Sequence, residues 1–480
     1  MALILNNSFL TSTTLIILGA FSSFSLPPYN FFFINFFTFP FFFYILVSNL
    51  NQNLLKNFLT GWFYGFGYFS SNLYWISNSL KFDENFDNLF ILSIILIPSL
   101  LSIYYGLFSL CIKFFNIKMN FNSILIFSLT LSFFEYLRGT IFGGFPWNLI
   151  SFSISEFTHS IQILSLIGTY SLNLIVINLY CLPIILLFKI KNQNKGIISL
   201  SVIAILLLNA GYGYNRIDRI EQTKQKTLFP SIKLISPKFK IERFFIDEPI
   251  ENRLNELIQI SYPLNKDFLL IYPEGIANIS ELNKARDNIE YISNQLTNQS
   301  KIILGISLED GEKIFNSLAL FDKNFLIEDK YNKNKLVPFG EFLPFEKFLS
   351  NFGLKKITHG YKSFSYSNQR NIITVNSTSF LPLICYEIIF SGQLNKNNGE
   401  YDFILNISED GWFGNTIGPA QHFSHSIFRS IEEGKDVLRV ANNGISAHVS
   451  LTGLVKNKLN TTEKGSIEIN TISRAIPTLF

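Results

Sequence analysis

Two apolar runs of this chain end in side chains that could do chemistry. The run before YPEG ends at Glu274, and the run before ICYE ends at Cys385. Between them, YNKNKLVPFGE carries two lysines, Lys333 and Lys335. A thiol has an unperturbed pKa near ~8.5 and reacts well only beside a base or a cation. A carboxylate can take its proton, and a lysine can stabilise the oxyanion on an attacked carbonyl, so these residues predict a cysteine nucleophile.

The three cysteines of the chain are not equivalent. Cys111 and Cys181 fall in long apolar segments, where a small thiol is commonplace, whereas Cys385 is the one cysteine of the polar half. Cys385 therefore has no disulfide partner in that half. A lone thiol in an oxidising compartment is a hazard unless it is buried or used, which favours a functional role.

Charge divides the chain into two parts. Only 13 of the first 213 residues are charged, against 61 of the remaining 267. A soluble domain carries about 25 % charged residues. The sequence therefore predicts a membrane domain over 1–213 and an extracytoplasmic catalytic domain over 214–480. The net charge of +4 is small for 480 residues, so nucleic acid is not an expected partner.

The first domain contains about seven apolar segments near the ~20 residues that a membrane helix needs. They lie near 9–26, 29–48, 57–79, 88–112, 121–138, 160–188 and 197–213. Lysines gather in the loops at 49–56, 113–120 and 189–196, and the acidic loop at 81–87 alternates with them. Lys/Arg-rich loops stay in the cytoplasm, so the N-terminus is expected inside and the second domain outside.

The second domain alternates short apolar runs with amphipathic segments, a pattern typical of α/β layers. Expected strands are 231–236, 267–273, 301–307, 317–322, 380–385, 402–408 and 445–451. Expected helices are 251–261, 280–296 and 419–434. Reactive groups in such folds gather where strands end, as Glu274 and Cys385 do.

With these motifs in hand, the sequence resembles the nitrilase superfamily, whose members use a Glu–Lys–Cys triad. It resembles most closely the membrane branch of that superfamily, the apolipoprotein N-acyltransferases. The resemblance covers nearly the whole chain and implies a multi-span helical domain followed by a nitrilase-like αββα sandwich. The segments that carry it are 67–80, 135–147, 272–275, 333–346, 384–387, 409–422 and 439–447.

The resemblance assigns roles residue by residue. It implies that Glu274 is the general base and Cys385 the nucleophile. The lysine of the family stands eight residues before the Glu of PFGE, which selects Lys333 and leaves Lys335 as a surface or supporting charge. The resemblance also implies three supporting residues, Glu341, Tyr386 and Glu387.

The implied reaction is the last step of lipoprotein maturation. An acyl chain moves from a membrane phospholipid to Cys385, and then from that thioester to the N-terminal amine of a diacylglyceryl-cysteine apolipoprotein, which predicts ping-pong kinetics. The implied location is the bacterial inner membrane, with the catalytic domain on the periplasmic side. No cofactor or metal is expected, because the five histidines form no ligand set.

Three apolar pieces are candidate lids or lipid-dipping loops, namely 238–245, 344–354 and GWFG at 411–414. The first of them carries Phe244 and Phe245 in a segment where the family usually has a Trp. The family also has one more span after the catalytic domain, whereas this chain stops at ISRAIPTLF, so its C-terminus is expected outside.

Two other functions fit parts of the pattern. A membrane-tethered amidase of the nitrilase type would use the same triad with water as acceptor, but one span would suffice as a tether. A transporter or receptor with an outer binding domain would need charged groups at mid-membrane or symmetry between spans, and the sequence shows neither.

Overall fold

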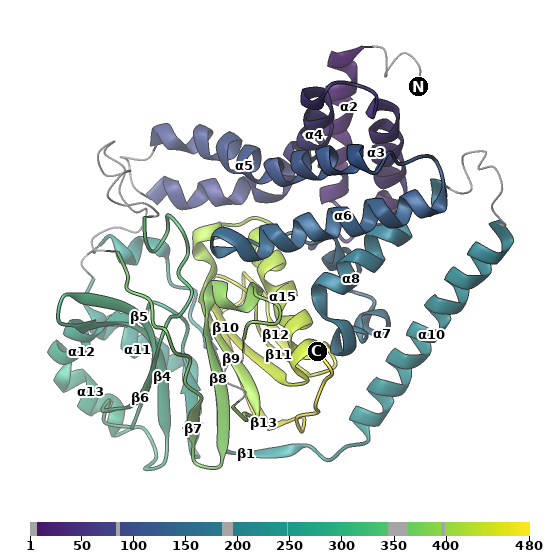
Figure 1. Cartoon of the computed structure of the whole chain (residues 1–480). Helices are drawn as coiled ribbons and strands as arrows, with labels where there is room; N and C mark the ends of the chain where they lie inside the picture. The colour runs from purple at the N-terminus through teal and green to yellow at the C-terminus, as the bar shows by residue number, and fades with distance from the viewer. Residues whose placement is uncertain (1–6, 83–86, 185–194, 247, 344–362, 395–398) are drawn as a thin grey trace. The chain divides into compact units, whose positions relative to one another are not determined.

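The computed structural model describes residues 7–82, 87–184, 195–246, 248–343, 363–394 and 399–480 (Figure 1). The chain divides into two compact units. The first comprises Met1–Asn78, Asn88–Asp218 and Leu479–Phe480, and the second comprises Ser79–Asp87 and Arg219–Thr478.

The first unit is helical, and each of the seven apolar segments of the sequence overlaps a helix. These are α2 (Ser8–Ser23), α3 (Asn35–Asn49), α4 (Leu54–Leu73), α5 (Asp87–Phe114), α6 (Phe121–Thr140), α8 (Leu164–Cys181) and α10 (Lys195–Glu221), with the short α7 (Thr158–Ile161) before α8. Within the part of the chain that the structure describes, five stretches are long and apolar enough to cross a membrane: Phe32–Asn49, Phe90–Phe114, Phe121–Gly143, Leu164–Cys181 and Lys195–Glu221. The other two helices are not among these five stretches. Helix α2 is apolar but only 16 residues long, and α4 is 20 residues long.

Three of these helices begin at an asparagine that caps them. The side chain of Asn7 accepts from the N–H groups of Phe9 and Leu10 at the start of α2. Asn53 does the same for α4, and Asn120 for α6. Such a cap satisfies N–H groups that have no partner within the helix, and it stabilises a helix by about 1 kcal/mol.

Small residues allow α2 and α4 to pack backbone to backbone. A Cβ on Gly19 would lie 2.0 Å from the carbonyl oxygen of Tyr64, and a Cβ on Gly67 would lie 2.0 Å from that of Ile16. Neither position tolerates a side chain at this spacing. Close approach through glycine is a common way for membrane helices to associate.

A charged pair lies inside the first unit at the end of α6. Arg138 donates to the carboxylate of Glu135 and to the carbonyl oxygen of Phe145, and both charged side chains are 1 % exposed or less. The guanidinium also lies 5.2 Å from the centre of the Phe69 ring. This pair joins α6 to α4 and to the turn that follows α6.

The second unit has two β-sheets. The strand order of the first is β13-β1-β2-β4-β5-β6, with β3 beside β4, and that of the second is β12-β11-β10-β9-β8-β7. The first sheet consists of β13 (Gly465–Ile472), β1 (Lys226–Ser236), β2 (Phe268–Ile271), β3 (Ala277–Asn278), β4 (Lys301–Asp310), β5 (Lys313–Phe321) and β6 (Ile327–Asn332). The second consists of β12 (Val455–Leu459), β11 (Ser446–Val449), β10 (Asp436–Asn442), β9 (Phe403–Glu409), β8 (Thr378–Ile384) and β7 (Ile373–Val375).

The sheets pack face to face with helices outside, which is the expected αββα sandwich (Figure 1). Strand β1 contacts β10 and β11 across the interface. On the outer side of the first sheet lie α11 (Ile250–Ser261), α12 (Ile279–Lys284) and α13 (Arg286–Ser293), and α15 (Gly418–Glu433) covers the second. Leu257 of α11, Ile292 of α13 and Leu304 of β4 belong to one buried cluster, so burial of apolar surface holds the first two layers together.

One expected helix is divided in the structure, and the expected strands do not include β3, β6, β7, β10, β12 or β13. The single helix expected over 280–296 is two helices, because Ala285 leaves the helical conformation (φ −87°, ψ 34°) and caps α12 with its N–H. Strand β10 was missed although all seven of its residues are buried. Its sequence, DVLRVAN, contains an Asp, an Arg and an Asn, so it does not read as an apolar run.

Candidate active site

The three residues expected to react stand just beyond the ends of strands. Glu274 follows β2 by three residues, Lys333 follows β6 directly, and Cys385 follows β8 directly. They are 8 %, 1 % and 8 % exposed, respectively. Burial of an unpaired charge is costly, so the ionisable groups among them need partners.

Lys333 lies between two carboxylates. Its Nζ donates to Oε1 of Glu341 at 3.0 Å and to Oε1 of Glu274 at 3.5 Å. Burial by itself favours the neutral amine, but the charges of Glu341 and Glu274 outweigh it and raise the pKa of Lys333. The side chain is therefore an ammonium, suited to stabilise a negative oxygen.

The charges of Glu274 and Lys333 both act on the pKa of the Cys385 thiol, in opposite directions. Burial raises the pKa of Cys385, the Glu274 carboxylate raises it further, and the Lys333 ammonium opposes them. The sulfur is therefore a thiol before reaction, and it needs a base to become a nucleophile. Among the carboxylates, Glu274 has the largest electrostatic influence on this thiol.

The backbone of Cys385 is strained. Its φ is +50°, in the left-handed region that a residue with a Cβ rarely adopts. The residue begins a short 3-10 helix, η8 (Cys385–Ile389), directly after β8. Such a conformation costs about 1–3 kcal/mol and persists only where the surroundings enforce it.

Glu387 connects the turn at Cys385 to the loop that begins at Lys333. Its Oε2 accepts from the N–H of Ile384 at 2.8 Å, and its Oε1 accepts from the N–H groups of Asn334 and Lys335 at 3.0 and 3.1 Å. Oε1 also accepts from the Tyr331 hydroxyl at 2.6 Å and from Arg370 at 2.8 Å. Burial would raise the pKa of Glu387, but these partners outweigh it and lower that pKa.

The other two residues of the expected set have plain roles in packing. Tyr386 is buried, and its ring meets the ring of Phe390 edge to face at 5.1 Å. Lys335 donates to Gln393 at 2.6 Å, and its Nζ lies 3.5 Å from the centre of the Phe390 ring. Its ammonium thus lies beside the residues that follow η8.

Two residues of the site escaped the sequence interpretation. Asn316, in the middle of β5, donates to Oε1 of Glu274 at 2.6 Å and to Oε1 of Glu341 at 2.7 Å. Glu409, the last residue of β9, donates its backbone N–H to Oε2 of Glu274 at 2.9 Å. The asparagine directly before the run SLALF and the acidic pair before GWFG were the available signals.

An aromatic group lies beside Glu274. The Phe244 and Trp412 rings stack at 5.5 Å, and Phe245 meets Trp412 edge to face. A Cβ on Gly275 would lie 2.7 Å from Phe244, so this glycine, with φ +67°, lets the ring approach. Of the candidate lids, 238–245 and 411–414 therefore meet at Trp412, whereas 344–354 lies outside the described residues.

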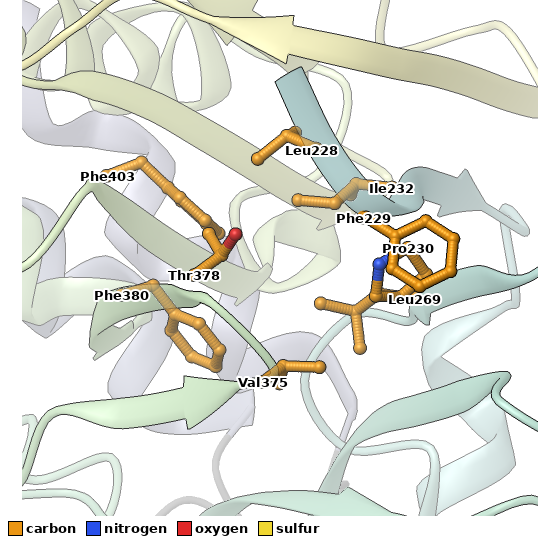
Figure 2. Close-up of a pocket in the computed structure, with 9 residues that line it drawn as sticks. All are labelled: Leu228, Phe229, Pro230, Ile232, Leu269, Val375, Thr378, Phe380 and Phe403. Atoms are coloured by element: carbon orange, nitrogen blue, oxygen red, sulfur yellow. The ribbon is translucent and has the colours of Figure 1, made fainter. Parts of the chain in front are cut away.

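A small apolar pocket opens elsewhere in the second unit (Figure 2). It is lined by Leu228, Phe229, Pro230, Ile232, Leu269, Val375, Thr378, Phe380 and Phe403. Phe380 precedes Cys385 by five residues along β8, roughly 17 Å at ~3.3 Å per strand residue. This pocket is therefore at the opposite end of the strands from the reactive side chains.

Within the described residues, no group of three or more His, Cys, Asp or Glu side chains is placed to hold a metal ion. The chemistry assembled around Cys385 is that of a buried thiol, a carboxylate and an ammonium. Such a set can form and cleave a thioester.

Comparison with known proteins identifies both halves of the chain. The description "Apolipoprotein N-acyltransferase N-terminal domain" matches residues 18–182, and "Carbon-nitrogen hydrolase" matches residues 293–477. The apolipoprotein N-acyltransferase of Rickettsia typhi is 32 % identical over 96 % of this chain and 91 % of that protein. The chain belongs to the apolipoprotein N-acyltransferase family. The enzymes of that name from Rickettsia prowazekii and Rhizobium rhizogenes are 31 % and 28 % identical, over 97 % and 96 % of this chain and 92 % and 89 % of theirs.

Membership in this family decides among the open alternatives. The chain is an acyltransferase with a nitrilase-like catalytic fold and a membrane domain, which disfavours the tethered amidase. It equally disfavours a transporter or receptor, because the relatives named above are enzymes and match nearly the whole chain.

Proposed function

We propose that this protein moves an acyl chain from a membrane phospholipid to the N-terminal amine of diacylglyceryl-cysteine apolipoproteins, through a thioester on Cys385. Glu274 is the general base, and Lys333 holds the oxyanion. Glu341, Tyr386 and Glu387 support them. The observation that carries the proposal is the buried ammonium of Lys333, held by two carboxylates beside a thiol.

The first half-reaction consumes the phospholipid. Glu274 takes the thiol proton while Sγ of Cys385 attacks the ester carbonyl carbon, and the carbonyl oxygen becomes an anion next to Lys333. When this intermediate collapses, the ester C–O bond breaks. The lysophospholipid alcohol leaves with the proton from Glu274, and the acyl group stays on sulfur.

The second half-reaction consumes the thioester. The apolipoprotein amine attacks the same carbonyl carbon, and Glu274 takes one amine proton. The C–S bond breaks, the amide forms, and the proton returns to the sulfur. Because the two substrates react in separate halves at one cysteine, the kinetics are ping-pong.

The membrane organisation follows the same proposal. Residues 1–213 form the membrane domain of about seven spans, and residues 214–480 form the catalytic domain on the periplasmic side of the inner membrane. Both substrates are held in one leaflet, so a membrane-anchored triad turns a search in three dimensions into one in two. Reporter fusions in the loops at 49–56 and 81–87 would test the orientation, which requires these two loops to lie on opposite sides.

Mass spectrometry tests the central step. The detergent-solubilised full chain incubated with phospholipid alone should gain one acyl group on the peptide that contains Cys385, and hydroxylamine should remove it. Cys385→Ala should abolish the adduct, whereas Cys111→Ala and Cys181→Ala should keep it. Absence of an adduct, under conditions where a diacylglyceryl peptide does become acylated, would contradict the covalent route.

A further inference from the structure

The backbone turn that carries Cys385 is held from both sides. On the side of the preceding residue, the N–H of Ile384 donates to Glu387 at 2.8 Å. On the other side, the carbonyl oxygen of Cys385 accepts from Nε2 of His422 at 3.2 Å and from Nδ2 of Asn406 at 3.5 Å. His422 and Asn406 have no part in the reaction steps above, although both contact the strained residue itself.

His422 is held in one orientation by buried charges. Its ring is fully buried on α15, with Nδ1 2.9 Å from Oδ1 of Asp410 and 3.0 Å from Nη2 of Arg439. Arg439 also donates to both carboxylate oxygens of Asp410, at 3.0 and 2.8 Å. Ser408 donates to the same carboxylate at 2.7 Å.

These contacts settle which ring nitrogen carries the proton. Burial and the Arg439 charge lower the pKa of His422, although Asp410 opposes them, so the ring is neutral at pH 7. Nε2 faces one acceptor, the carbonyl oxygen of Cys385, whereas Nδ1 lies beside both a donor, Nη2 of Arg439, and an acceptor, Oδ1 of Asp410. With the one N–H at Nε2, both the Cys385 carbonyl and the Arg439 donor have a hydrogen-bond partner on the ring, so this tautomer fits the contacts best. Nδ1 then accepts from Arg439, and the ring cannot rotate without breaking both bonds.

The packing around Asp410 and His422 also holds these two side chains in place. A Cβ on Gly444 would lie 2.2 Å from Oδ2 of Asp410. Position 444, two residues after the end of β10, must therefore be glycine for the Asp410 carboxylate to occupy its place. The edge of the Phe413 ring meets the ring of His422 at 5.7 Å. The histidine is therefore fixed by charge, hydrogen bonding and packing together.

We propose that His422 is a positioning residue: its Nε2–H holds the carbonyl of Cys385 and so keeps the nucleophile in the left-handed conformation from which Sγ faces Glu274 and Lys333. Arg439 holds His422 in turn, and Asp410 holds Arg439. This inference rests on the proposed function, since it concerns the thioester-forming sulfur. Without the N–H donor, Cys385 relaxes to an unstrained backbone and its sulfur leaves the productive geometry.

Two amide substitutions at His422 distinguish an effect of its hydrogen bond to Cys385 from an effect of its packing. In His422→Gln the side-chain amide reaches about as far as Nε2 and can still donate to Cys385, whereas in His422→Asn it reaches only as far as Nδ1. Both are polar and smaller than histidine, so both fit the buried site. The rate of Cys385 acylation is measured by mass spectrometry with phosphatidylethanolamine in detergent micelles, per folded full-length enzyme.

We expect His422→Asn to slow acylation by about 10- to 100-fold, the factor that the backbone strain sets. We expect the KM for phospholipid to stay within about twofold, because the change acts on the nucleophile and not on binding. His422→Gln should recover most of the lost rate. Equal rates in the two variants, whether both like the wild type or both equally slow, would overturn the proposal.

His448 provides the matched control. It is another buried histidine, with Nε2 2.7 Å from Oδ2 of Asp436. It lies on β11, where its partner across the sheet is Leu438 of β10. His448→Asn and His448→Gln should change the thermal stability but not the acylation rate per folded molecule. If the wild type forms no adduct at all, the proposed function fails; if the wild type reacts and the two His422 variants do not differ, only the present inference fails.

Discussion

Replacement of Glu387 by glutamine tests the link between the turn at Cys385 and the loop that begins at Lys333. The carboxylate accepts five hydrogen bonds, from both sides of the site. A glutamine side chain has one oxygen and one NH₂ group. Whichever way the amide turns, an NH₂ group must face at least one backbone N–H, and the Arg370 guanidinium loses its charged partner.

The expected magnitude follows from this geometry. A buried donor without an acceptor costs about 1–3 kcal/mol, and breaking a buried ion pair costs about 3–5 kcal/mol in total. For a domain of this size each kcal/mol lowers the melting temperature by about 2–4 °C, so we expect a decrease of about 6–20 °C. The acylation rate should fall by at least about tenfold as well, because Ile384 and Asn334 adjoin Cys385 and Lys333.

The assay compares melting temperature and Cys385 acylation in the full-length protein in detergent. Glu433→Gln is the control, since Glu433 also accepts from a tyrosine hydroxyl, that of Tyr401, at 2.7 Å but is not bonded to either loop. A Glu387→Gln protein as stable as the wild type would refute the reasoning. So would a loss of acylation no larger than that of the Glu433→Gln control.

Three further changes have definite expected outcomes. Lys333→Met should abolish acylation of the cysteine, and Lys333→Arg should not restore it, because a guanidinium does not fit the space that holds Nζ; mass spectrometry of the adduct decides. Burial would raise the pKa of Asp410, but the Arg439 charge and the hydrogen bond from Ser408 act against burial, and the pKa is lowered, so the carboxylate stabilises the fold above its ordinary pKa of 3.8. The free energy of unfolding should therefore be level above about pH 5 and fall as the pH drops below about 4, and Asp410→Asn should flatten that fall in chemical denaturation curves. Arg138→Leu leaves the Glu135 carboxylate buried without its partner and should cost about 3–5 kcal/mol; the double substitution Glu135→Gln with Arg138→Met should recover part of the lost thermal stability, and a double variant no better than the single one would contradict this.

The sequence predicts those parts of the site that local patterns encode. Glu274 and Cys385 each stand after an apolar run, and a reactive group at a strand end is a position that sheets favour for chemistry. The choice of Lys333 over Lys335 came from the family spacing, not from composition. In the structure the Lys333 ammonium contacts Glu274 and Glu341, whereas that of Lys335 contacts Gln393.

What the sequence did not reveal depends on strand order. Asn316 precedes Glu341 by 25 residues and follows Glu274 by 42, and it meets both because β5 lies two strands from β2 in the first sheet. His422 lies on a helix and Cys385 on a different turn, 37 residues apart. No short-range pattern records such a meeting, and His422 and His425, three residues apart, read as one ordinary face of an amphipathic helix.

The trio formed by Glu274, Lys333 and Glu341 has a consequence for the energetics of the proposed cycle. With both acids ionised, the resting trio carries one net negative charge. When Glu274 is protonated and the carbonyl oxygen is negative, the trio and the oxygen together again sum to one negative charge. The net charge of the enclosed site therefore stays the same when the proton moves. The large desolvation cost of burying an ion arises when the polypeptide folds and does not recur in each catalytic cycle. Turnover should accordingly respond little to the ionic strength of the surrounding medium.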